Sequence, residues 1–244
     1  MKKHLIFIAL LAFLMACKPT SYQISGSKVA FVETNSSLTE DSATLKIIEP
    51  YKKQIDTQMQ EIIGYAEKEL GKEHQANEIL LGNFIADITQ KRAEKAFAKP
   101  VDFAFVTYGG LRTSIPAGTI RVSDIFELMP FENELVVLEL KGSTVKKLFE
   151  YLVARRNISI SNSKVFIENK ALKDVLINNE PIENQRTYYV ATSDYLANGG
   201  DNLDFLKEAI NMTFANVKIR DMIIEAIRSL QKIDAQIEGR VQER

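Results

Sequence analysis

The sequence is poor in histidine and cysteine, the side chains on which many hydrolytic sites depend. Its two histidines are His4 and His74, and its one cysteine is Cys17. A hydrolase with two metal ions usually places more than one imidazole among its ligands, and a lone cysteine cannot form a disulfide within the chain. We therefore expect no catalytic residue, no metal site and no cofactor in this chain.

An excess of charge of one sign is also lacking. The 31 basic and 32 acidic residues leave a formal net charge of −1, so electrostatics gives no reason to expect a nucleic acid polymer as a partner. The sequence has no glycine-rich phosphate loop, no Gly-x-Ser-x-Gly elbow and no His-Glu-x-x-His zinc motif. A Ser-His-Asp triad would have to include His74, which has no supporting context. The usual catalytic motifs are therefore missing.

The N-terminal hydrophobic run is too short for a comfortable membrane span. It covers the twelve residues 5–16 and follows a basic Lys2-Lys3 pair, as in a signal peptide. It ends in Leu14-Met15-Ala16-Cys17, which resembles the bacterial lipobox and implies lipidation of Cys17. The alternative is an ordinary secretory signal with an incidental cysteine. We expect a lipid-anchored protein of the bacterial cell envelope, facing the periplasm or the surface.

The length of 244 residues suits one domain. We expect a signal peptide over 1–16, a tether over 17–43 that is rich in Ser, Thr and Asn, and one domain over 44–244. The tether includes the apolar cluster 28–32, where a single strand is the alternative to an irregular segment.

Apolar spacing within the domain predicts both helices and strands. The stretch from Leu45 to Ile63 has the three- and four-residue spacing of an amphipathic helix that needs a partner surface. Further helices are predicted after Asn77 as far as Lys99, over 142–154 and over 219–237. Strands are predicted over 101–106, 121–128, 135–140 and 187–192, with a hairpin over 164–181.

Three loops that follow or join predicted strands carry side chains suited to a nucleotide. The first has Gly109-Gly110 and Arg112, the second has Phe131 and Asn133, and the third has Tyr195 and 199–201. Glycine lets the backbone approach a ligand, arginine presents a planar fork to phosphate or ribose oxygens, and an amide can pair with a base edge. The alternative reading of each loop is structural: tight turns, a ring that fills the core, and an aspartate that caps a helix.

Five motifs occur in the order in which they stand in a known family. They are Leu81-Gly82-Asn83-Phe84-Ile85-Ala86-Asp87, Gly109-Gly110-Leu111-Arg112, Ile115-Pro116-Ala117-Gly118-Thr119-Ile120, Pro130-Phe131-Glu132-Asn133 and Tyr195-Leu196-Ala197-Asn198-Gly199-Gly200-Asp201. Over residues 47–204 the chain resembles the C-terminal, substrate-binding domain of the 5′-nucleotidase family. The resemblance implies an α+β fold, a layered α/β/β/α sandwich.

The resemblance also implies a nucleotide site. The base would lie between the rings of Phe131 and Tyr195, with Asn133 near the base. Arg112 would contact ribose or phosphate, and Asp201 would hold ribose hydroxyls. Gly110, Gly199 and Gly200 complete the set of expected nucleotide-binding residues.

Two positions depart from the family pattern. Thr107 stands where members commonly have an asparagine that reaches the base. The arginine that several members have just before the Leu-Gly-Asn motif is missing from residues 73–78. Both departures reduce the affinity that we expect for the phosphate side of a nucleotide.

Three functions follow as expectations. In the first, the chain is the nucleotide-binding domain of a phosphohydrolase system for nucleotide catabolism, and a separate metallophosphatase chain with divalent metals performs the hydrolysis. In the second, it is a nucleotide- or nucleoside-binding envelope lipoprotein with no enzymatic role. In the third, the fold serves protein contacts and the rings of Phe131 and Tyr195 fill the core.

Overall fold

The computed structural model describes residues 22–23, 26–75 and 77–243. Cys17 and the predicted signal peptide over 1–16 lie outside the described residues. Contacts divide the chain into two units, 1–47 and 48–244. No helix among the described residues is both long enough and apolar enough to span a membrane.

The first unit has little regular structure over its described residues. Residues 26–41 form no helix or strand, so the strand considered over 28–32 is not formed. Helix α2 (Ser42–Met59) begins where the carboxylate of Asp41 accepts the backbone N–H of Thr44 at 2.7 Å. This hydrogen bond holds the pKa of Asp41 below its ordinary value.

Helix α2 differs from the prediction in its end and in its packing. It stops at Met59, and the next apolar residues belong to strand β1 (Ile62–Ala66). The prediction that the helix continues to Ile63 is wrong, because Ile63 packs into a core as part of a strand. No residue of α2 is buried.

The second unit is built on a five-stranded sheet in the order β12-β6-β11-β4-β7. Its strands are β4 (Phe103–Val106), β6 (Glu134–Lys141), β7 (Ser159–Ile160), β11 (Thr187–Ser193) and β12 (Asn211–Lys218). Strand β11 runs parallel to β4 and antiparallel to β6, with Ser193 opposite Leu135. The ends of β4 and β11 and the start of β6 therefore meet at one edge of the sheet, which we call the loop edge.

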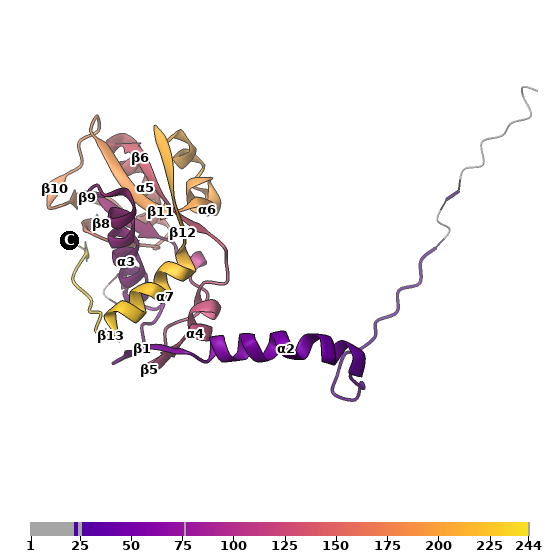
Figure 1. The fold of residues 1–244 in the computed structure, drawn as a ribbon. Coiled ribbons are helices and arrows are strands. Elements are labelled where there is room, and N and C mark those ends of the chain that lie inside the picture. Colours follow the sequence, from indigo (N-terminus) through magenta and orange to yellow (C-terminus); the bar gives the residue numbers. More distant parts are fainter. Residues whose placement is uncertain (1–21, 24–25, 76, 244) are drawn as a thin grey trace, which may run out of the picture. The chain divides into compact units, whose positions relative to one another are not determined.

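Side chains alternate between the two faces of this sheet, as strand geometry requires. Ala104 and Val106 of β4 point into one core, and Phe103 and Phe105 point into the other. Helices α3 (Leu80–Phe97), α4 (Val122–Leu128) and α7 (Ile219–Leu230) supply the first core. They are joined there by a small sheet, in the order β13 (Lys232–Ile233), β1 and β5 (Gly118–Arg121). Helices α3 and α7 lie side by side (Figure 1).

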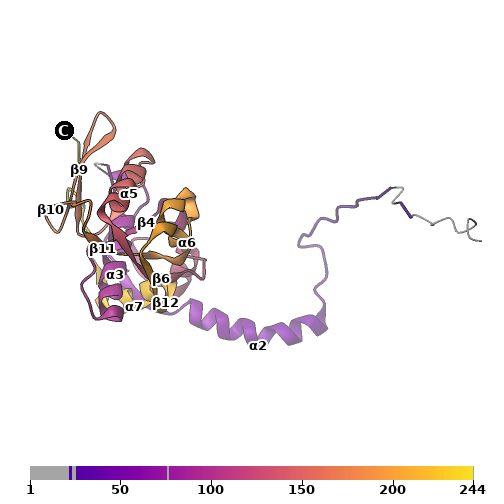
Figure 2. The ribbon, with the colours of Figure 1, turned by 90° about the horizontal axis from the view of Figure 1, so that it is seen from above.

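The second core lies between the opposite face of the sheet, helix α5 (Gly142–Ala154) and a four-stranded sheet in the order β10-β9-β8-β14. Figure 2 shows α5 beside this second sheet. The strands are β8 (Ser163–Glu168), β9 (Ala171–Ile177), β10 (Glu180–Pro181) and β14 (Val241–Glu243). The predicted hairpin over 164–181 is confirmed, and so is the mixed α and β fold class.

Three segments differ from their predictions. The strand predicted over 121–128 is wrong, since strand β5 (Gly118–Arg121) leads into helix α4, where the backbone N–H of Arg121 donates to Asp124. Helix α7 ends at Leu230 and gives way to strand β13 (Lys232–Ile233). Strand β12 was not predicted, because its partly exposed side chains give no clear alternation.

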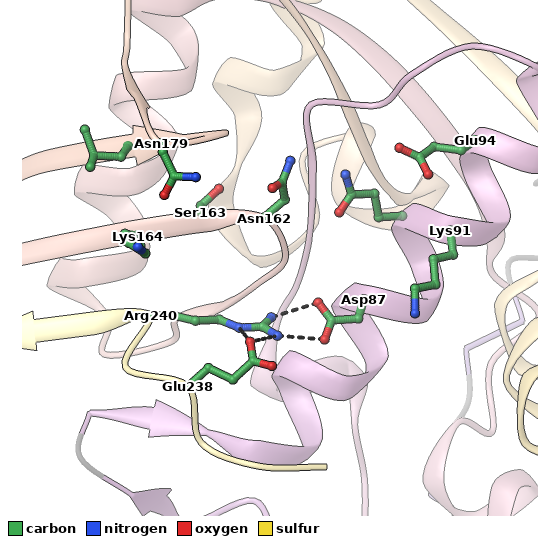
Figure 3. Close-up of a pocket in the computed structure, with 11 residues that line it drawn as sticks. Asp87, Lys91, Glu94, Asn162, Ser163, Lys164, Asn179, Glu238 and Arg240 are labelled. Carbon is green, nitrogen blue, oxygen red and sulfur yellow. Dashed lines mark hydrogen bonds and ion pairs between the residues drawn. The ribbon is translucent and has the colours of Figure 1, made fainter. Parts of the chain in front are cut away.

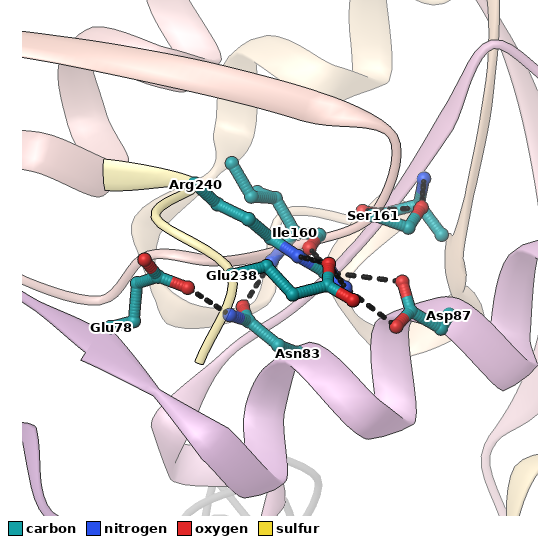
Figure 4. A network of polar contacts seen from close by, with 8 residues as sticks. Glu78, Asn83, Asp87, Ile160, Ser161, Glu238 and Arg240 are labelled. Carbon is teal, nitrogen blue, oxygen red and sulfur yellow. Dashed lines mark hydrogen bonds and ion pairs between the residues drawn. The ribbon is translucent and has the colours of Figure 1, made fainter. Parts of the chain in front are cut away.

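The Leu-Gly-Asn motif holds the start of α3 against β7. A Cβ on Gly82 would collide with the hydroxyl of Ser159, so the helix can approach this closely only with glycine. The amide of Asn83 donates to Glu78 at 2.8 Å and its oxygen accepts the N–H of Ile160 at 3.4 Å (Figure 4). Both polar atoms of the Asn83 side chain thus have structural partners.

Candidate functional site

All eight residues predicted to bind a nucleotide lie on the three loops of the loop edge. The first loop leaves β4, the second enters β6, and the third leaves β11. The backbone N–H of Glu134 donates to the carboxylate of Asp194 at 3.0 Å, which ties the second loop to the third. A Cβ on Gly109 would lie 3.4 Å from the Asp201 carboxylate, so the first loop also contacts the third.

The third loop places Tyr195 and Asp201 against each other. The Tyr195 hydroxyl donates to Oδ1 of Asp201 at 3.1 Å and accepts the backbone N–H of Asp201 at 3.3 Å. A Cβ on Gly200 would lie only 2.6 Å from Cδ1 of Tyr195. Gly199 has a φ of 89°, a backbone conformation that favours glycine. The glycine pair therefore sets where the Tyr195 ring lies.

The second loop exposes the ring of Phe131. The Arg112 guanidinium lies 5.9 Å from the centre of this ring, within the range of a cation–π contact. The neighbouring Glu132 forms ion pairs with Lys218 and Arg220. The carbonyl of Asn133 accepts the N–H of Ile219 at 2.9 Å, which fixes the backbone of this loop two residues after Phe131.

Neither candidate ring fills the core. Phe131 is 39% exposed and Tyr195 is 50% exposed, whereas large apolar side chains in a core are buried almost completely. This exposure contradicts the expectation that the two rings serve only as core filling. Both rings therefore present part of their surface to solvent at the loop edge.

A cavity of about 570 Å³, which we call the Arg155 pocket, adjoins the third loop. The first loop and the third loop line one part of it, with Tyr108, Gly109, Asp201 and Asn202. The end of α5, the residues that follow it and His74 line the rest, with Tyr151, Arg155, Arg156 and Asn157. The sequence analysis missed the α5 residues, because a pair of arginines at a helix end is an ordinary feature of helix termini. No motif marked them as part of a site.

The end of α5 is fixed to two of the three loops. The side chain of Asn157 accepts the backbone N–H of Tyr108 at 2.7 Å. The Tyr151 hydroxyl donates to the carbonyl of Asp201 at 2.5 Å. Burial raises the pKa of Tyr151, the negative charge of Asp201 raises it further, and Arg155 acts in the opposite direction.

A second cavity of about 640 Å³, the Arg240 pocket, lies between α3, the start of β8 and the C-terminal segment (Figure 3). Arg240 is 8% exposed and makes two hydrogen bonds to Asp87, at 2.8 and 2.7 Å. It also pairs with Glu238 and donates to the carbonyl of Ile160 (Figure 4). Burial lowers the pKa of Arg240, but the two carboxylates outweigh burial and raise it overall.

No three His, Cys, Asp or Glu side chains gather as a set that could hold a metal ion in residues 22–23, 26–75 and 77–243.

The family model for the 5′-nucleotidase C-terminal domain matches residues 62–208, more than half of the chain. Among curated proteins, Protein UshA of Yersinia enterocolitica is 27% identical over 213 residues, which are 84% of this chain and 38% of UshA. The 5′-nucleotidase of Mus musculus is 26% identical over 236 residues, which are 85% of this chain and 41% of that protein. The chain thus spans about two fifths of the length of these relatives.

A solved structure is similar over the same share of the chain. It is the crystal structure of a 5′-nucleotidase precursor from Thermus thermophilus, with 27% identity and a TM-score of 0.72. The match covers 84% of this chain and 43% of that protein. The resemblance therefore extends from the motifs to the arrangement of the elements.

Proposed function

Because the chain belongs to the family of 5′-nucleotidase C-terminal domains, we propose that it binds a nucleotide or nucleoside at the loop edge. The observation that carries the proposal is the exposure of two aromatic rings, Phe131 and Tyr195, on loops that hydrogen bonds hold together. In a core these rings would be buried. The family provides the ligand class, and the exposed rings provide a means of binding it.

Each ring contributes by stacking on the base. Base–aromatic stacking is worth about 1–3 kcal/mol per base by alanine substitution, so two rings supply a large part of the roughly −8 kcal/mol of a micromolar complex. The side chain of Asn133 gives the base edge a hydrogen-bonding partner, and Asp201 accepts from sugar hydroxyls. Arg112 binds ribose or phosphate oxygens, while Gly110, Gly199 and Gly200 leave room for the ligand.

We further propose that the chain works with a separate metallophosphatase chain in nucleotide catabolism. The relatives named as 5′-nucleotidases are more than twice as long as the matched segment, so this chain corresponds to one part of them. In this proposal the divalent metals belong to the partner. The competing proposal is a nucleotide-binding envelope lipoprotein without an enzymatic role, which predicts binding in the absence of any partner and no stimulation of a phosphatase.

The binding proposal is tested by titrating AMP and adenosine into the purified full chain by calorimetry. We expect Phe131→Ala to weaken both ligands by about 10- to 100-fold, since one stacking contact is lost. Tyr51→Ala is the matched control, because it removes a 66% exposed ring from α2. The absence of binding by either ligand at millimolar concentration would refute the binding proposal, and wild-type affinity in the Phe131 variant would refute the base clamp.

The catalytic proposal is tested by assaying phosphate release from AMP with added Mg²⁺ or Mn²⁺. We expect no turnover by the chain alone and release when a metallophosphatase chain encoded beside it is added. Release by the chain alone would contradict the division of labour. If this chain delivers the substrate, the Phe131→Ala variant should stimulate phosphate release by the metallophosphatase less than the wild type does.

The lipid anchor is a separate proposal that rests on the lipobox resemblance at Cys17. It predicts that cells fed a labelled fatty acid incorporate the label into the wild-type chain and not into Cys17→Ser. Label in the serine variant would refute lipidation at this position. Fractionation of the same cells should place the wild-type chain with the envelope membranes.

A further inference from the structure

We propose that the Arg155 pocket binds a phosphate group of the nucleotide, with Arg155 and Arg156 as its ligands. This inference rests on the proposed binding of a nucleotide at the loop edge and assigns the phosphate a place in the molecule. It concerns two residues outside the five motifs that carry the family resemblance.

Charge is the first support. Arg155 and Arg156 bring two guanidinium groups to the pocket wall, and Asp201 is the one carboxylate among the described residues that line it. Neither guanidinium has a carboxylate within ion-pair distance among the described residues. The Arg155 guanidinium lies 5.8 Å from the centre of the Tyr151 ring. Arginine presents a planar set of donors that fits phosphate oxygens.

A third cation, Lys72, does not line the pocket but contacts one residue of its wall. The Lys72 ammonium lies 4.0 Å from the centre of the Tyr108 ring, and Tyr108 lines the pocket. The positive charges therefore outnumber the single carboxylate. A ligand with negative charge is favoured there.

The usual structural role of arginines at a helix end does not account for these two. Such side chains commonly hydrogen-bond the last carbonyl groups of the helix. Here backbone N–H groups already do so: Arg155 donates to Tyr151, Arg156 to Val153 and Asn157 to Leu152, at 2.9 to 3.0 Å. Arg156 has a φ of 50°, a conformation that a non-glycine residue seldom adopts. The carbonyls of Tyr151, Leu152 and Val153 therefore do not need the two guanidinium groups as caps.

Position is the second support. The pocket reaches Asp201, which belongs to the proposed nucleotide site, and Gly109, which precedes Gly110 of that site. Asn157 holds the first loop and Tyr151 holds the third, so the backbone that carries the two arginines is fixed relative to both. Because the pocket adjoins Asp201, the proposed sugar contact, we place the phosphate of a bound nucleotide in it. Asn157 is a positioning residue in this arrangement.

The test compares ligands with and without phosphate on the full chain. Adenosine, 5′-AMP and 3′-AMP are titrated into the wild type and into Arg155→Ala/Arg156→Ala. In the wild type we expect at least one of the two monophosphates to bind about tenfold or more tightly than adenosine, because charge-assisted hydrogen bonds are the strong ones. The phosphate position that gives the gain identifies which end of the ribose faces the pocket.

The double variant should lose this gain and bind the favoured monophosphate about as weakly as adenosine, while adenosine affinity stays unchanged. The matched control is Lys146→Ala/Lys147→Ala, which removes two exposed positive charges from the same helix outside the pocket. Arg155→Lys/Arg156→Lys should restore part of the gain, because it keeps the charge without the planar donors.

Two results overturn the inference. If adenosine and both monophosphates bind the wild type equally, or if the double variant keeps the gain, the pocket does not bind phosphate, although the nucleotide proposal survives. If none of the three ligands binds, the proposed function fails, and the inference fails with it.

Discussion

Both pockets contain arginine and aspartate side chains but arrange their charges in opposite ways. In the Arg240 pocket the guanidinium of Arg240 is saturated by Asp87, Glu238 and a backbone carbonyl (Figure 4). In the Arg155 pocket two guanidinium groups face the cavity without a carboxylate partner among the described residues. An arginine with its donors satisfied joins segments of the fold, whereas one with its donors open can bind a ligand.

The difference also separates stability from binding. Arg240 joins helix α3 to the C-terminal segment and lies almost fully buried, so its removal leaves partners without a counter-charge. Arg155 and Arg156 are exposed, and exposed charges contribute little to stability. Substitution of Arg240 should change the free energy of unfolding, and substitutions of Arg155 and Arg156 should change the affinity for a nucleotide.

Arg240→Met should give the largest effect on the fold. We expect a loss of about 2–3 kcal/mol in the free energy of unfolding, less than for a fully buried pair because the side chain of Asp87 is 34% exposed. Urea denaturation measures this change. Arg155→Met is the matched control and should change stability by less than about 0.5 kcal/mol. Equal losses in the two variants would break the comparison between the pockets.

Gly200→Ala should give the next largest effect, and on binding rather than on stability. The added Cβ would lie 2.6 Å from Cδ1 of Tyr195, so the ring must move away from its present position. We expect nucleotide affinity to fall by about tenfold, near 1.4 kcal/mol, as one stacking face is misplaced. Calorimetry measures the affinity, and unchanged urea denaturation confirms that the variant is folded. Unchanged affinity would show that the Tyr195 ring does not stack on the ligand.

Tyr151→Phe should give the smallest effect and should depend on pH. The variant loses the hydrogen bond to the Asp201 carbonyl, worth about 0.5–1.5 kcal/mol. Because the folded pKa of Tyr151 is raised above its ordinary 10.0, the protonated phenol stabilises the fold below that pH. This contribution is lost as the pH rises through the raised pKa.

The wild type should therefore lose stability above pH 10 more steeply than Tyr151→Phe. Urea denaturation across the alkaline range measures both slopes. Parallel slopes would show that ionisation of Tyr151 is not coupled to folding.

The sequence predicted most of the central elements, because their patterns are strong. The helix after Asn77 and the strands over 101–106 and 187–192 have clear apolar spacing, and the structure has α3, β4 and β11 there. The three candidate loops were found because each adjoins such a strand. Strand β11 pairs in parallel with β4 and antiparallel with β6, and this pairing brings the three loops to one edge of the sheet.

Other features depend on contacts between distant residues, which local patterns do not encode. The segment 121–128 has a strand-like composition, but a cap at Asp124 and packing against α7 make it a helix. Strand β14 exists only by pairing with β8, about 75 residues earlier in the chain. The Arg155 pocket forms where the end of α5 meets two loops. The sequence around its two arginines therefore does not indicate that they line a pocket.

The reversal of direction between β11 and β6 has a consequence for motion. Amides at the end of β4, the start of β6 and the end of β11 are remote in sequence, yet a ligand that bridges their loops would hold them as one cooperative unit. Amide hydrogen exchange reports the free energy of such local opening. Saturating ligand should slow exchange at all three positions by a common factor, set by its concentration relative to Kd.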